Sequence, residues 1–345
     1  MELPRHRVDL RAMVRLTELA DYVVPFCLRV ACDLRLADHL ADGPRSVEEL
    51  ADLTGTRPGP LLRLLRTLAS REVFAETTPT VFALTDLAQP LRSDHPLSLA
   101  DAYPLLSCDV AAWGRLDHSV RTGQAAFDLV HGTDYWQYMA THPDESRRFD
   151  ASQRAATRLE LRSVLGAYPW SELNTVVDLG GGDGGFLAGI LARFRHLRGT
   201  LFDLPHVASG AAKVFADAGV SDRAEAVGGS FLEPDGQPVP AGADAYLFKR
   251  VLYHWDDESA TVLLRKARAA MRPDSRLLII EPVVDPVVQG EAYVTGLRYD
   301  MLLLTMAGGG AREVSAIENL ARDADLRLVR TIGTLTLPIL EICPA

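Results

Sequence analysis

The sequence predicts an α/β protein in which a mainly helical N-terminal domain precedes a doubly wound parallel sheet. Residues 11–160 repeat apolar residues at helical spacing almost throughout. Residues 165–345 instead alternate short runs rich in Val, Ile and Leu with amphipathic segments, as a parallel sheet covered by helices on both faces requires. A glycine-rich turn follows the first of these runs. We therefore expect two domains, residues 1–160 and residues 161–345.

Residues 46–85 predict a winged-helix element within the helical domain. Ser46 and Glu49 have the spacing of a capping box at the start of a short helix, which Gly55 ends. A second helix has prolines near its first turn, and the alternation over residues 73–85 predicts a small hairpin. Such elements can read DNA, but a net charge of -10 argues against a nucleic-acid partner. We expect a dimerisation module or a lid over the substrate.

The composition indicates an ordinary globular protein, with 48% hydrophobic and 24% charged residues. The four cysteines form no CxxC pair and no metal-ligand spacing, so we expect them to be reduced. The N-terminus lacks the apolar core of a signal peptide, and no run approaches the roughly 18 apolar residues that cross a membrane. These features predict a cytoplasmic protein without a membrane partner.

The most informative stretch is TVVDLGGGDGGFLAGILARF, residues 175–194, in which a buried strand leads through a glycine turn into a helix. Glycine is needed where the backbone takes positive φ or where a ligand lies against it. Gly180, Gly182 and Gly185 also fit the GxGxxG of dinucleotide-binding loops, so the glycines alone do not decide the ligand. Asp178 and Asp183 would repel a pyrophosphate, but they suit the sulfonium and ammonium groups of S-adenosylmethionine.

A further acid, Asp203, ends the next apolar run, 23 residues after Gly180. In doubly wound sheets this is the position of the acid that binds the two ribose hydroxyls of a nucleotide. The sequence thus predicts a nucleoside-type site at the carboxyl ends of the first two strands.

With these residues the chain resembles the small-molecule O-methyltransferases that bind S-adenosyl-L-methionine, above all bacterial enzymes that tailor aromatic polyketides, including the anthracycline group. The segments that carry the resemblance are VPFCLRVACDLRLADHLADGPRSVEELADLTG, VVDLGGGDGGFLAGIL, LRGTLFDLPHV, RPDSRLLIIEPV and RYDMLLLTMAGGGARE. The resemblance implies a C-terminal Rossmann-like class I methyltransferase domain and S-adenosyl-L-methionine as cofactor. It also implies a homodimer formed through the N-terminal winged-helix domain.

The resemblance assigns roles to individual residues at matching positions. Asp178, Gly180 and Gly182 would line the methionine end of the cofactor, and Asp203 would bind its ribose. Ser230 and Phe231 would flank the adenine, and Trp255 would pack beside the adenine or the pocket wall. Lys249 would hold the cofactor from the following strand. Those expected to touch the substrate are Trp136, Tyr138, Phe149, Gln153, Asp300 and Arg312. The aromatic residues among the latter could equally belong to helix–helix packing.

The catalytic pattern departs from that of many relatives, in which His-Asp-Trp follows this strand and the His takes the proton from the substrate hydroxyl. Aligned through Trp255, this chain has Tyr253 in the place of the His and His254 in the place of the Asp. The acid that orients the His in relatives is replaced by Ala311, while Arg312 is kept. Both parts of the usual base machinery are therefore altered.

Three hypotheses follow for the reaction. His254 could act as the base from one residue further along, because neutral imidazole titrates near neutral pH. Alternatively, no side-chain base is needed, since proximity and orientation contribute roughly 7–11 kcal/mol in favourable cases. The protein could also bind the cofactor for a non-methylating step, such as hydroxylation or pericyclic ring closure. We expect the second, in an S-adenosylmethionine-dependent O-methyltransferase that acts on a hydroxyl of a small aromatic, polyketide-type natural product.

No metal ion is expected. The acids of WDDES, residues 255–259, complement the positive N-terminal end of the next helix. Adjacent acids diverge instead of converging on one ion, and no supporting cluster of His and Asp is apparent.

Overall fold

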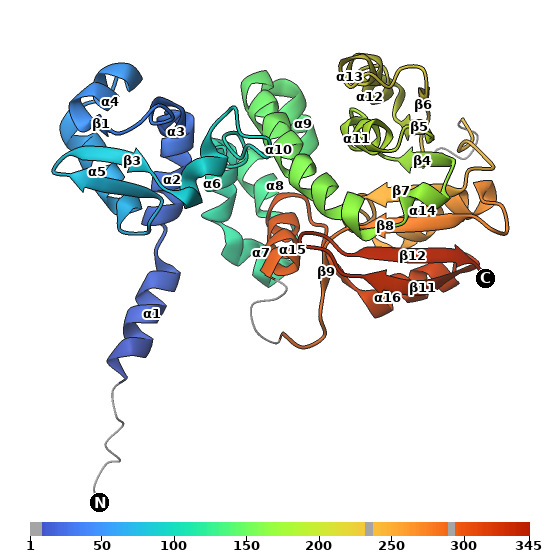
Figure 1. Ribbon diagram of the computed structural model, residues 1–345. Coiled ribbons are helices and arrows are strands. Elements are labelled where there is room, and N and C mark those ends of the chain that lie inside the picture. The colour runs from blue at the N-terminus through green and yellow to red at the C-terminus, as the bar shows by residue number, and fades with distance from the viewer. Residues whose placement is uncertain (1–8, 232–236, 289–293) are drawn as a thin grey trace, which may run out of the picture. The chain divides into compact units, whose positions relative to one another are not determined.

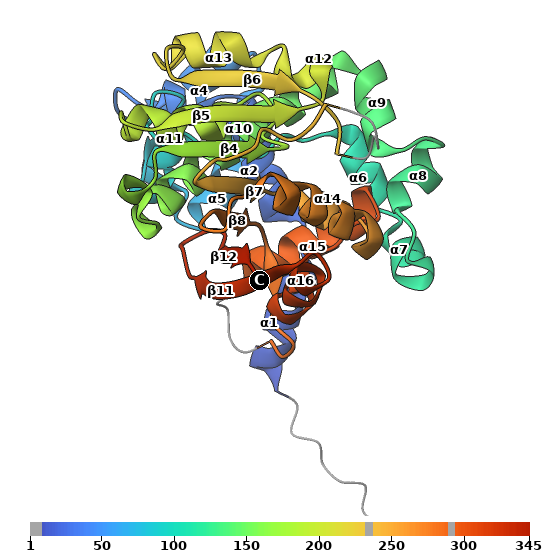
Figure 2. The same ribbon diagram turned by 90° about the vertical axis from the view of Figure 1, so that its right-hand side faces the viewer.

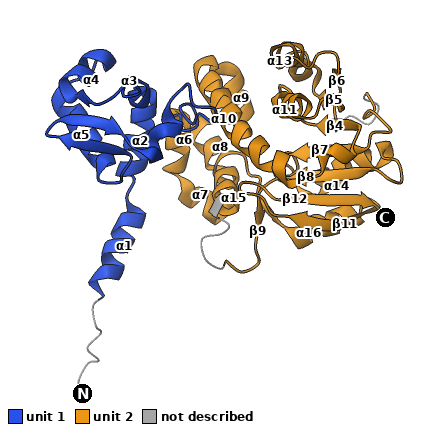
Figure 3. Cartoon of the chain, viewed as in Figure 1, with its two compact units in different colours: residues 1–105 blue, residues 106–345 orange. Residues whose placement is uncertain are grey.

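The computed structural model describes residues 9–231, 237–288 and 294–345. The chain divides into two compact units, residues 1–105 and residues 106–345 (Figure 3). The boundary expected from the sequence, between residues 160 and 161, lies inside helix α10 (Pro143–Ala167). The helices that follow residue 105 belong to the same compact unit as the large sheet, since α10 packs on α11, and α6 and α8 pack on α15.

The N-terminal unit contains the winged-helix arrangement of helices and hairpin (Figure 1). Its helices are α1 (Leu10–Ala20), α2 (Val23–Asp33), α3 (Leu36–His39), α4 (Val47–Thr54) and α5 (Pro58–Ala69). Strands β1 (Arg45–Ser46), β3 (Val81–Leu84) and β2 (Phe74–Thr78) form an antiparallel sheet in this order, followed by η1 (Asp86–Leu91). The capping box of α4 is confirmed, because Ser46 N donates to Glu49 Oε2 at 2.8 Å and Glu49 N donates to Ser46 Oγ at 3.2 Å.

The C-terminal unit is built on a seven-stranded sheet in the order β11-β12-β8-β7-β4-β5-β6 (Figure 2). The parallel strands are β4 (Thr175–Leu179), β5 (Arg198–Asp203), β6 (Ala224–Gly228), β7 (Ala245–Lys249) and β8 (Arg276–Ile280). Strands β11 (Leu326–Ile332) and β12 (Ile339–Pro344) add the expected antiparallel hairpin at one edge. The chain runs outward from β4 to β6 and resumes with β7 on the other side of β4. This reversal is the switch point at which doubly wound sheets bind ligands.

Helices cover both faces of this sheet: α14 and α16 share one buried cluster with it, and α10, α11 and α13 share the other (Figures 1 and 2). The helices of this unit are α6 (Ser107–Trp113), α7 (Leu116–Thr122), α8 (Ala126–His131), α9 (Tyr135–Thr141), α10, η2 (Trp170–Glu172), α11 (Gly185–Arg193), α12 (Pro205–Ala208), α13 (Ala211–Asp217), η3 (Leu252–His254), α14 (Asp257–Ala270), α15 (Val294–Met306) and α16 (Val314–Arg322). A short parallel pair, β9 (Val283–Val284) and β10 (Arg312–Glu313), lies outside the main sheet. None of the helices in the described ranges has the length and apolar character needed to cross a membrane.

Strand β7 shows why the strands of this sheet have nearly continuous apolar sequences. Tyr246 and Phe248 belong to one buried cluster, which includes residues of α14 and α16. Ala245 and Leu247 belong to a second cluster, which includes residues of α10, α11 and α13. Because successive side chains of a strand point to opposite faces, a strand between two helical layers needs an apolar residue at every position.

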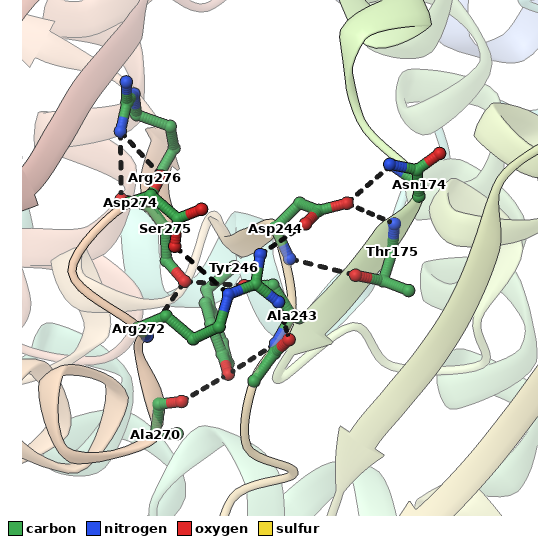
Figure 4. Close-up of polar contacts among 11 residues, drawn as sticks. Asn174, Thr175, Ala243, Asp244, Tyr246, Ala270, Arg272, Asp274, Ser275 and Arg276 are labelled. Carbon is green, nitrogen blue, oxygen red and sulfur yellow. Dashed lines mark hydrogen bonds and ion pairs between the residues drawn. The ribbon is translucent and has the colours of Figure 1, made fainter.

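Polar contacts join the amino ends of β4, β7 and β8 (Figure 4). Asp244 Oδ2 accepts hydrogen bonds from Asn174 N at 2.6 Å and from Thr175 N at 3.0 Å. Its Oδ1 lies 2.5 Å from Arg272 Nη2. Burial raises the pKa of Asp244, but the hydrogen bonds from Arg272 and from the backbone outweigh this effect and lower it. This network stabilises the end of the sheet opposite to the switch point.

Candidate active site

The glycine loop between β4 and α11 has a backbone that side chains would disturb. Gly180, Gly182 and Gly184 have φ angles of 71°, 65° and 81°, in the left-handed region that favours glycine. A Cβ atom at Gly181 would lie only 2.4 Å from Asp178 Oδ2. The loop therefore presents bare backbone at the carboxyl end of β4, where a ligand can approach closely.

Asp178 is the strongest indication of a cationic ligand beside this loop. Its side chain is fully buried, and neither carboxylate oxygen has a hydrogen-bond partner among the described residues. Burial raises the pKa of Asp178 to about 7, Lys249 opposes this effect and Asp203 adds to it. Leaving a buried carboxylate without donors is costly. The position thus fits the ammonium group of S-adenosylmethionine, which carries the donors that this carboxylate lacks.

Asp203, at the end of β5, connects this strand to the glycine loop that follows β4. Its Oδ2 accepts a hydrogen bond from Gly182 N at 2.8 Å, and its Oδ1 accepts one from Leu204 N at 2.7 Å. Burial raises the pKa of Asp203, although these two N–H groups act in the opposite direction. Each carboxylate oxygen retains a second lone pair, so the predicted hydrogen bonds from ribose hydroxyls are compatible with these contacts.

Phe231 lies close to the same loop. Its ring centroid is 5.2 Å from that of Phe202 and 5.9 Å from that of Phe248. Its Cε2 atom lies 3.8 Å from the place that a Cβ on Gly180 would take. Trp255 is partly buried against the same apolar cluster. These apolar surfaces are compatible with the predicted adenine position, to which Ser230, two residues after β6, is also assigned.

Lys249, the last residue of β7, is bound by helix α10. Its Nζ lies 2.6 Å from Glu160 Oε2 and donates to Thr157 Oγ1 at 3.0 Å. Burial lowers the pKa of Lys249 to about 8, with a further decrease from Arg250, while Glu160 opposes both. Lys249 therefore joins α10 to the end of β7. Its direct contact with the cofactor stays a prediction.

The sequence patterns do not single out Glu160, although it is central to this cluster. Its side chain is 5% exposed and lies between two cations, 2.6 Å from Lys249 Nζ and 3.6 Å from Arg250 Nη1. Burial raises the pKa of Glu160, but Arg250 and then Lys249 lower it below its ordinary value. One signal was available: Glu160 precedes Val164 by one turn on the buried stripe of α10, and an acid there requires a partner.

Arg250 has a φ angle of 56°, which is uncommon for a residue with a side chain. Its guanidinium donates to Gln153 Oε1 at 2.7 Å and to Tyr299 Oη at 3.1 Å. The amide oxygen of Gln153, which we predicted to touch the substrate, is thus engaged by Arg250. Arg250 brings a buried positive charge to the turn that carries Tyr253 and His254.

Tyr253 and His254 belong to η3, which begins three residues after the end of β7, and their ring centroids are 4.3 Å apart with an interplanar angle of 32°. In an extended strand two consecutive side chains would point to opposite faces, whereas this single turn of 3₁₀ helix places the two rings side by side. Tyr253 is buried, and burial raises the pKa of its hydroxyl above the usual range. The buried hydroxyl of Tyr253 therefore holds its proton more tightly than an exposed tyrosine does.

His254 keeps an unpaired nitrogen. Its Nδ1 is buried and has no hydrogen-bond partner among the described residues. Burial, with a contribution from Arg250, lowers the pKa of His254 to about 4, so the imidazole is neutral at neutral pH. Trp136 of α9 packs edge-on against this ring, with centroids 5.9 Å apart. A neutral imidazole nitrogen of this kind can form a hydrogen bond with a ligand hydroxyl.

The other predicted aromatic contacts belong to helix packing. Tyr138 lies with its ring 5.3 Å from that of Phe127, and the ring of Phe149 lies 5.5 Å from that of Tyr135. Both side chains pack against the buried cluster formed by α6, α8, α9 and α15. Trp136 is different, because it is 53% exposed and reaches His254. Of the three aromatic residues predicted to touch the substrate, Trp136 is thus the one whose ring packs against His254.

Asp300 and Arg312, both predicted to touch the substrate, hold backbone groups instead. Asp300 Oδ1 accepts a hydrogen bond from Ala311 N at 2.9 Å. Arg312 Nη1 donates to Leu252 O at 2.9 Å and its Nη2 to Trp255 O at 2.6 Å. These contacts occupy Asp300 Oδ1 and the Arg312 guanidinium, because β10 pairs with β9 and brings Arg312 onto the turn after β7. A contact of either side chain with substrate stays a prediction.

The described residues contain no group of three or more His, Cys, Asp or Glu side chains arranged to hold a metal ion. Asp256 caps α14 by accepting a hydrogen bond from Ser259 N at 2.8 Å, which is the structural role expected for the acids of this segment.

The doubly wound sheet, the glycine loop and the acids after β4 and β5 define a class: the S-adenosylmethionine-dependent methyltransferases. Comparison with known proteins identifies the family. Residues 113–327 match the family model of the O-methyltransferase domain, and residues 17–94 match that of the O-methyltransferase dimerisation domain.

Individual relatives are similar over nearly the whole chain. The phenazine O-methyltransferase PhzM of Lysobacter antibioticus is 38% identical over 333 residues, which are 96% of each protein. The aclacinomycin 10-hydroxylase RdmB of Streptomyces purpurascens is 36% identical over 345 residues, 97% of this chain and 90% of that protein. The O-methyltransferase NcsB1 from neocarzinostatin biosynthesis, solved with S-adenosylmethionine and 2-hydroxy-5-methyl naphthoic acid, has a TM-score of 0.76 at 34% identity, covering 99% of this chain and all of that one.

The chain belongs to the O-methyltransferase family. It is an S-adenosylmethionine-dependent enzyme with an N-terminal dimerisation domain and a C-terminal Rossmann-like domain.

Proposed function

We propose that this enzyme methylates a hydroxyl oxygen of a small aromatic, polyketide-type natural product, and that it does so by holding the two reactants together without a strong side-chain base. The observation that carries the proposal is the buried Asp178 carboxylate beside the glycine loop, which has no hydrogen-bond partner among the described residues. The acceptor class is supported by the relatives, one named for a phenazine and another solved with a naphthoic acid.

When bound, S-adenosylmethionine supplies an electrophilic methyl group on a sulfonium. On the protein side, Asp178 would bind its ammonium group, Asp203 its ribose, and Phe231 one face of its adenine. Gly180 and Gly182 give the cofactor access to the backbone of the loop. The Glu160–Lys249 pair would keep helix α10 against the end of β7.

His254 is suited to orient the acceptor and poorly suited to deprotonate it. A phenol with an ordinary pKa of about 10 transfers its proton to an imidazole of pKa about 4 with an equilibrium constant of only about 10⁻⁶. The buried Nδ1 can nevertheless form a hydrogen bond that orients the acceptor hydroxyl. Orientation and proximity, roughly 7–11 kcal/mol in favourable cases, would then supply most of the acceleration.

A non-methylating reaction is the second candidate, favoured by the similarity to a hydroxylase of 36% identity and by the altered base positions Tyr253 and Ala311. One experiment separates the two. The purified enzyme is incubated with S-adenosylmethionine and a panel of hydroxylated phenazines, naphthoates and anthracyclines. S-adenosylhomocysteine and an acceptor heavier by one methylene group support methyl transfer. The second candidate would be supported if the enzyme binds S-adenosylmethionine and converts an acceptor, but forms neither S-adenosylhomocysteine nor a methylated acceptor.

We further propose a homodimer in which a second copy covers helix α1. This helix has no buried residue, and five large apolar side chains are each more than half exposed: Leu10, Met13, Val14, Leu16 and Leu19. A surface of this kind normally lies in an interface. The match of residues 17–94 to a dimerisation domain supports another copy of the chain as the partner.

A cytoplasmic location agrees with the state of the cysteines. Cys27, Cys32, Cys108 and Cys343 are all free, and burial raises the pKa of Cys32 to about 11, so its thiol is unreactive.

A further inference from the structure

The turn that carries Tyr253 and His254 has few hydrogen bonds of its own. It consists of η3 (Leu252–His254) and Trp255, with internal hydrogen bonds from His254 N to Val251 O at 3.2 Å and from Trp255 N to Leu252 O at 3.0 Å. A single turn of 3₁₀ helix leaves most of its backbone groups unpaired. Its geometry therefore depends on partners from other segments.

Glu281 binds the turn from the N–H side. It follows β8 directly, is 1% exposed, and its Oε2 accepts a hydrogen bond from Tyr253 N at 3.3 Å. Burial raises the pKa of Glu281 to about 7, which Arg312 and the backbone N–H groups of Tyr253, Leu252 and Val251 oppose. The carboxylate thus faces the start of the turn.

Arg312 binds the same turn from the carbonyl side. Its guanidinium donates to Leu252 O at 2.9 Å and to Trp255 O at 2.6 Å, so it spans the turn from its first residue to its last. Nε also lies 2.8 Å from Asp257 Oδ1 at the start of α14. The parallel pairing of Arg312 with Val283 brings the Glu281 and Arg312 segments together.

The glycine run 308–310 closes on the turn from the same side. Gly310 N donates to Tyr253 O at 3.1 Å. A Cβ atom at Gly309 would lie 2.5 Å from Tyr253 O and 3.4 Å from His254 Cα, so no larger residue fits there. Asp300 holds the far end of the run through Ala311 N at 2.9 Å.

We propose that Arg312 and Glu281 are positioning residues, which fix the turn from both sides and thereby aim the imidazole of His254 at the acceptor hydroxyl. The role of His254 rests on the proposed function, whereas the clamp on the turn does not. In this chain the segment GGGARE would contribute geometry, since Ala311 stands where the resemblance implies an acid. Neither residue need touch the cofactor or the acceptor.

The test compares Arg312→Ala with Arg322→Ala, a control that removes an exposed arginine of α16 in a surface pair with Glu318. The side chains of the nine histidines are labelled with ¹³C, and the His254 signal is assigned through its loss in His254→Gln. The chemical shift of this signal is followed from pH 4.5 to 8. Arg250, the charge that contributes to the low pKa of His254, is present in every variant. We expect the His254 midpoint to move upward toward 6.5 in Arg312→Ala and to stay below 5 in the control and the wild type. An unchanged midpoint in Arg312→Ala would overturn the proposal.

Three further measurements separate positioning from stability alone. Arg312→Lys keeps the positive charge but loses the planar guanidinium that reaches two carbonyls. It should therefore raise the His254 midpoint less than Arg312→Ala does. If Arg312→Ala does not fold, Arg312→Lys replaces it in the titration. Glu281→Gln keeps one acceptor for Tyr253 N and should also shift the midpoint only partly. In kinetics, Arg312→Ala should lower kcat/KM for the acceptor by roughly 2–10-fold, with the affinity for S-adenosylmethionine within twofold of wild type.

The double variant His254→Ala with Arg312→Ala should be no slower than the slower single variant, because both changes remove the same contact. If the fold-reductions in kcat/KM of the two single variants multiply in the double variant, Arg312 acts independently of His254 and the proposal is wrong. If no acceptor is methylated at all, the proposed function fails while the NMR titration still decides whether Arg312 positions His254.

Discussion

Replacing Asp178 by Asn should weaken cofactor binding and at the same time stabilise the free enzyme. Asn keeps the shape of the side chain but removes the negative charge, which has no hydrogen-bond partner among the described residues. The lost charge-assisted hydrogen bond to the ammonium group is worth about 1.5–3 kcal/mol, so the Kd for S-adenosylmethionine should rise roughly 10–150-fold.

The gain in stability follows from the pKa of Asp178. A pKa of about 7 in the folded state, against about 3.9 in the unfolded chain, means that the folded state holds this proton more tightly. Stability is therefore lost as pH rises from about 4 to about 7, by up to about 4 kcal/mol for a separation of this size. Asp178→Asn lacks this loss, so its advantage over the wild type should grow from pH 5 upward and be largest near pH 8.

Urea unfolding of the free enzyme at pH 5, 6, 7 and 8 measures this effect, and calorimetric titration with S-adenosylmethionine measures the affinity. Asp244→Asn is the matched control, because the pKa of Asp244 is lowered by Arg272 and the backbone. Its contribution is present at neutral pH and lost as pH falls, so this variant should be less stable at pH 7 and bind the cofactor normally. Wild-type cofactor affinity in Asp178→Asn, or the same pH slope as the wild type, would refute the assignment of this carboxylate.

Three other variants test the rest of the site and the interface. Asp203→Ala leaves Gly182 N and Leu204 N without their acceptor, so it should weaken cofactor binding and, unlike Asp178→Asn, lower stability by about 1–3 kcal/mol in urea unfolding. His254→Ala should reduce kcat/KM only about 2–10-fold, the value of one hydrogen bond, and the wild-type rate should show no inflection near pH 6.5; a fall of 100-fold or more would indicate a true base. Leu16→Glu combined with Leu19→Glu should give a 37.7 kDa monomer in light scattering, whereas Leu335→Glu, at an exposed turn, should leave the dimer intact.

The parts of the fold that depend on local patterns could be predicted from the sequence. Ser46 and Glu49 form their capping box because the two groups are three residues apart on one helical turn. The strand β4, the glycine loop and α11 are contiguous, so the run TVVDLGGGDGGF specifies them together. Apolar residues at the first four positions of β7, Ala245 to Phe248, indicated a strand between two helical layers.

Contacts between distant segments could not be predicted in the same way. Glu160 meets Lys249, 89 residues further along, only because α10 packs across the end of β7. Arg312 was expected at the substrate and instead binds the backbone of Leu252 and Trp255, since the pairing of β9 with β10 decides where its guanidinium lies.

The sequence by itself determined the fold class, the S-adenosylmethionine loop and the altered residues at positions 253, 254 and 311, since each depends on residue identity and short spacing. Only the tertiary structure decided what His254 can do. Burial and the charge of Arg250 lower the pKa of its imidazole to about 4, and a 3₁₀ turn places it beside Tyr253 and Trp136. A pKa depends on the solvent and charges around a group, and those surroundings come from segments that the chain brings together only on folding.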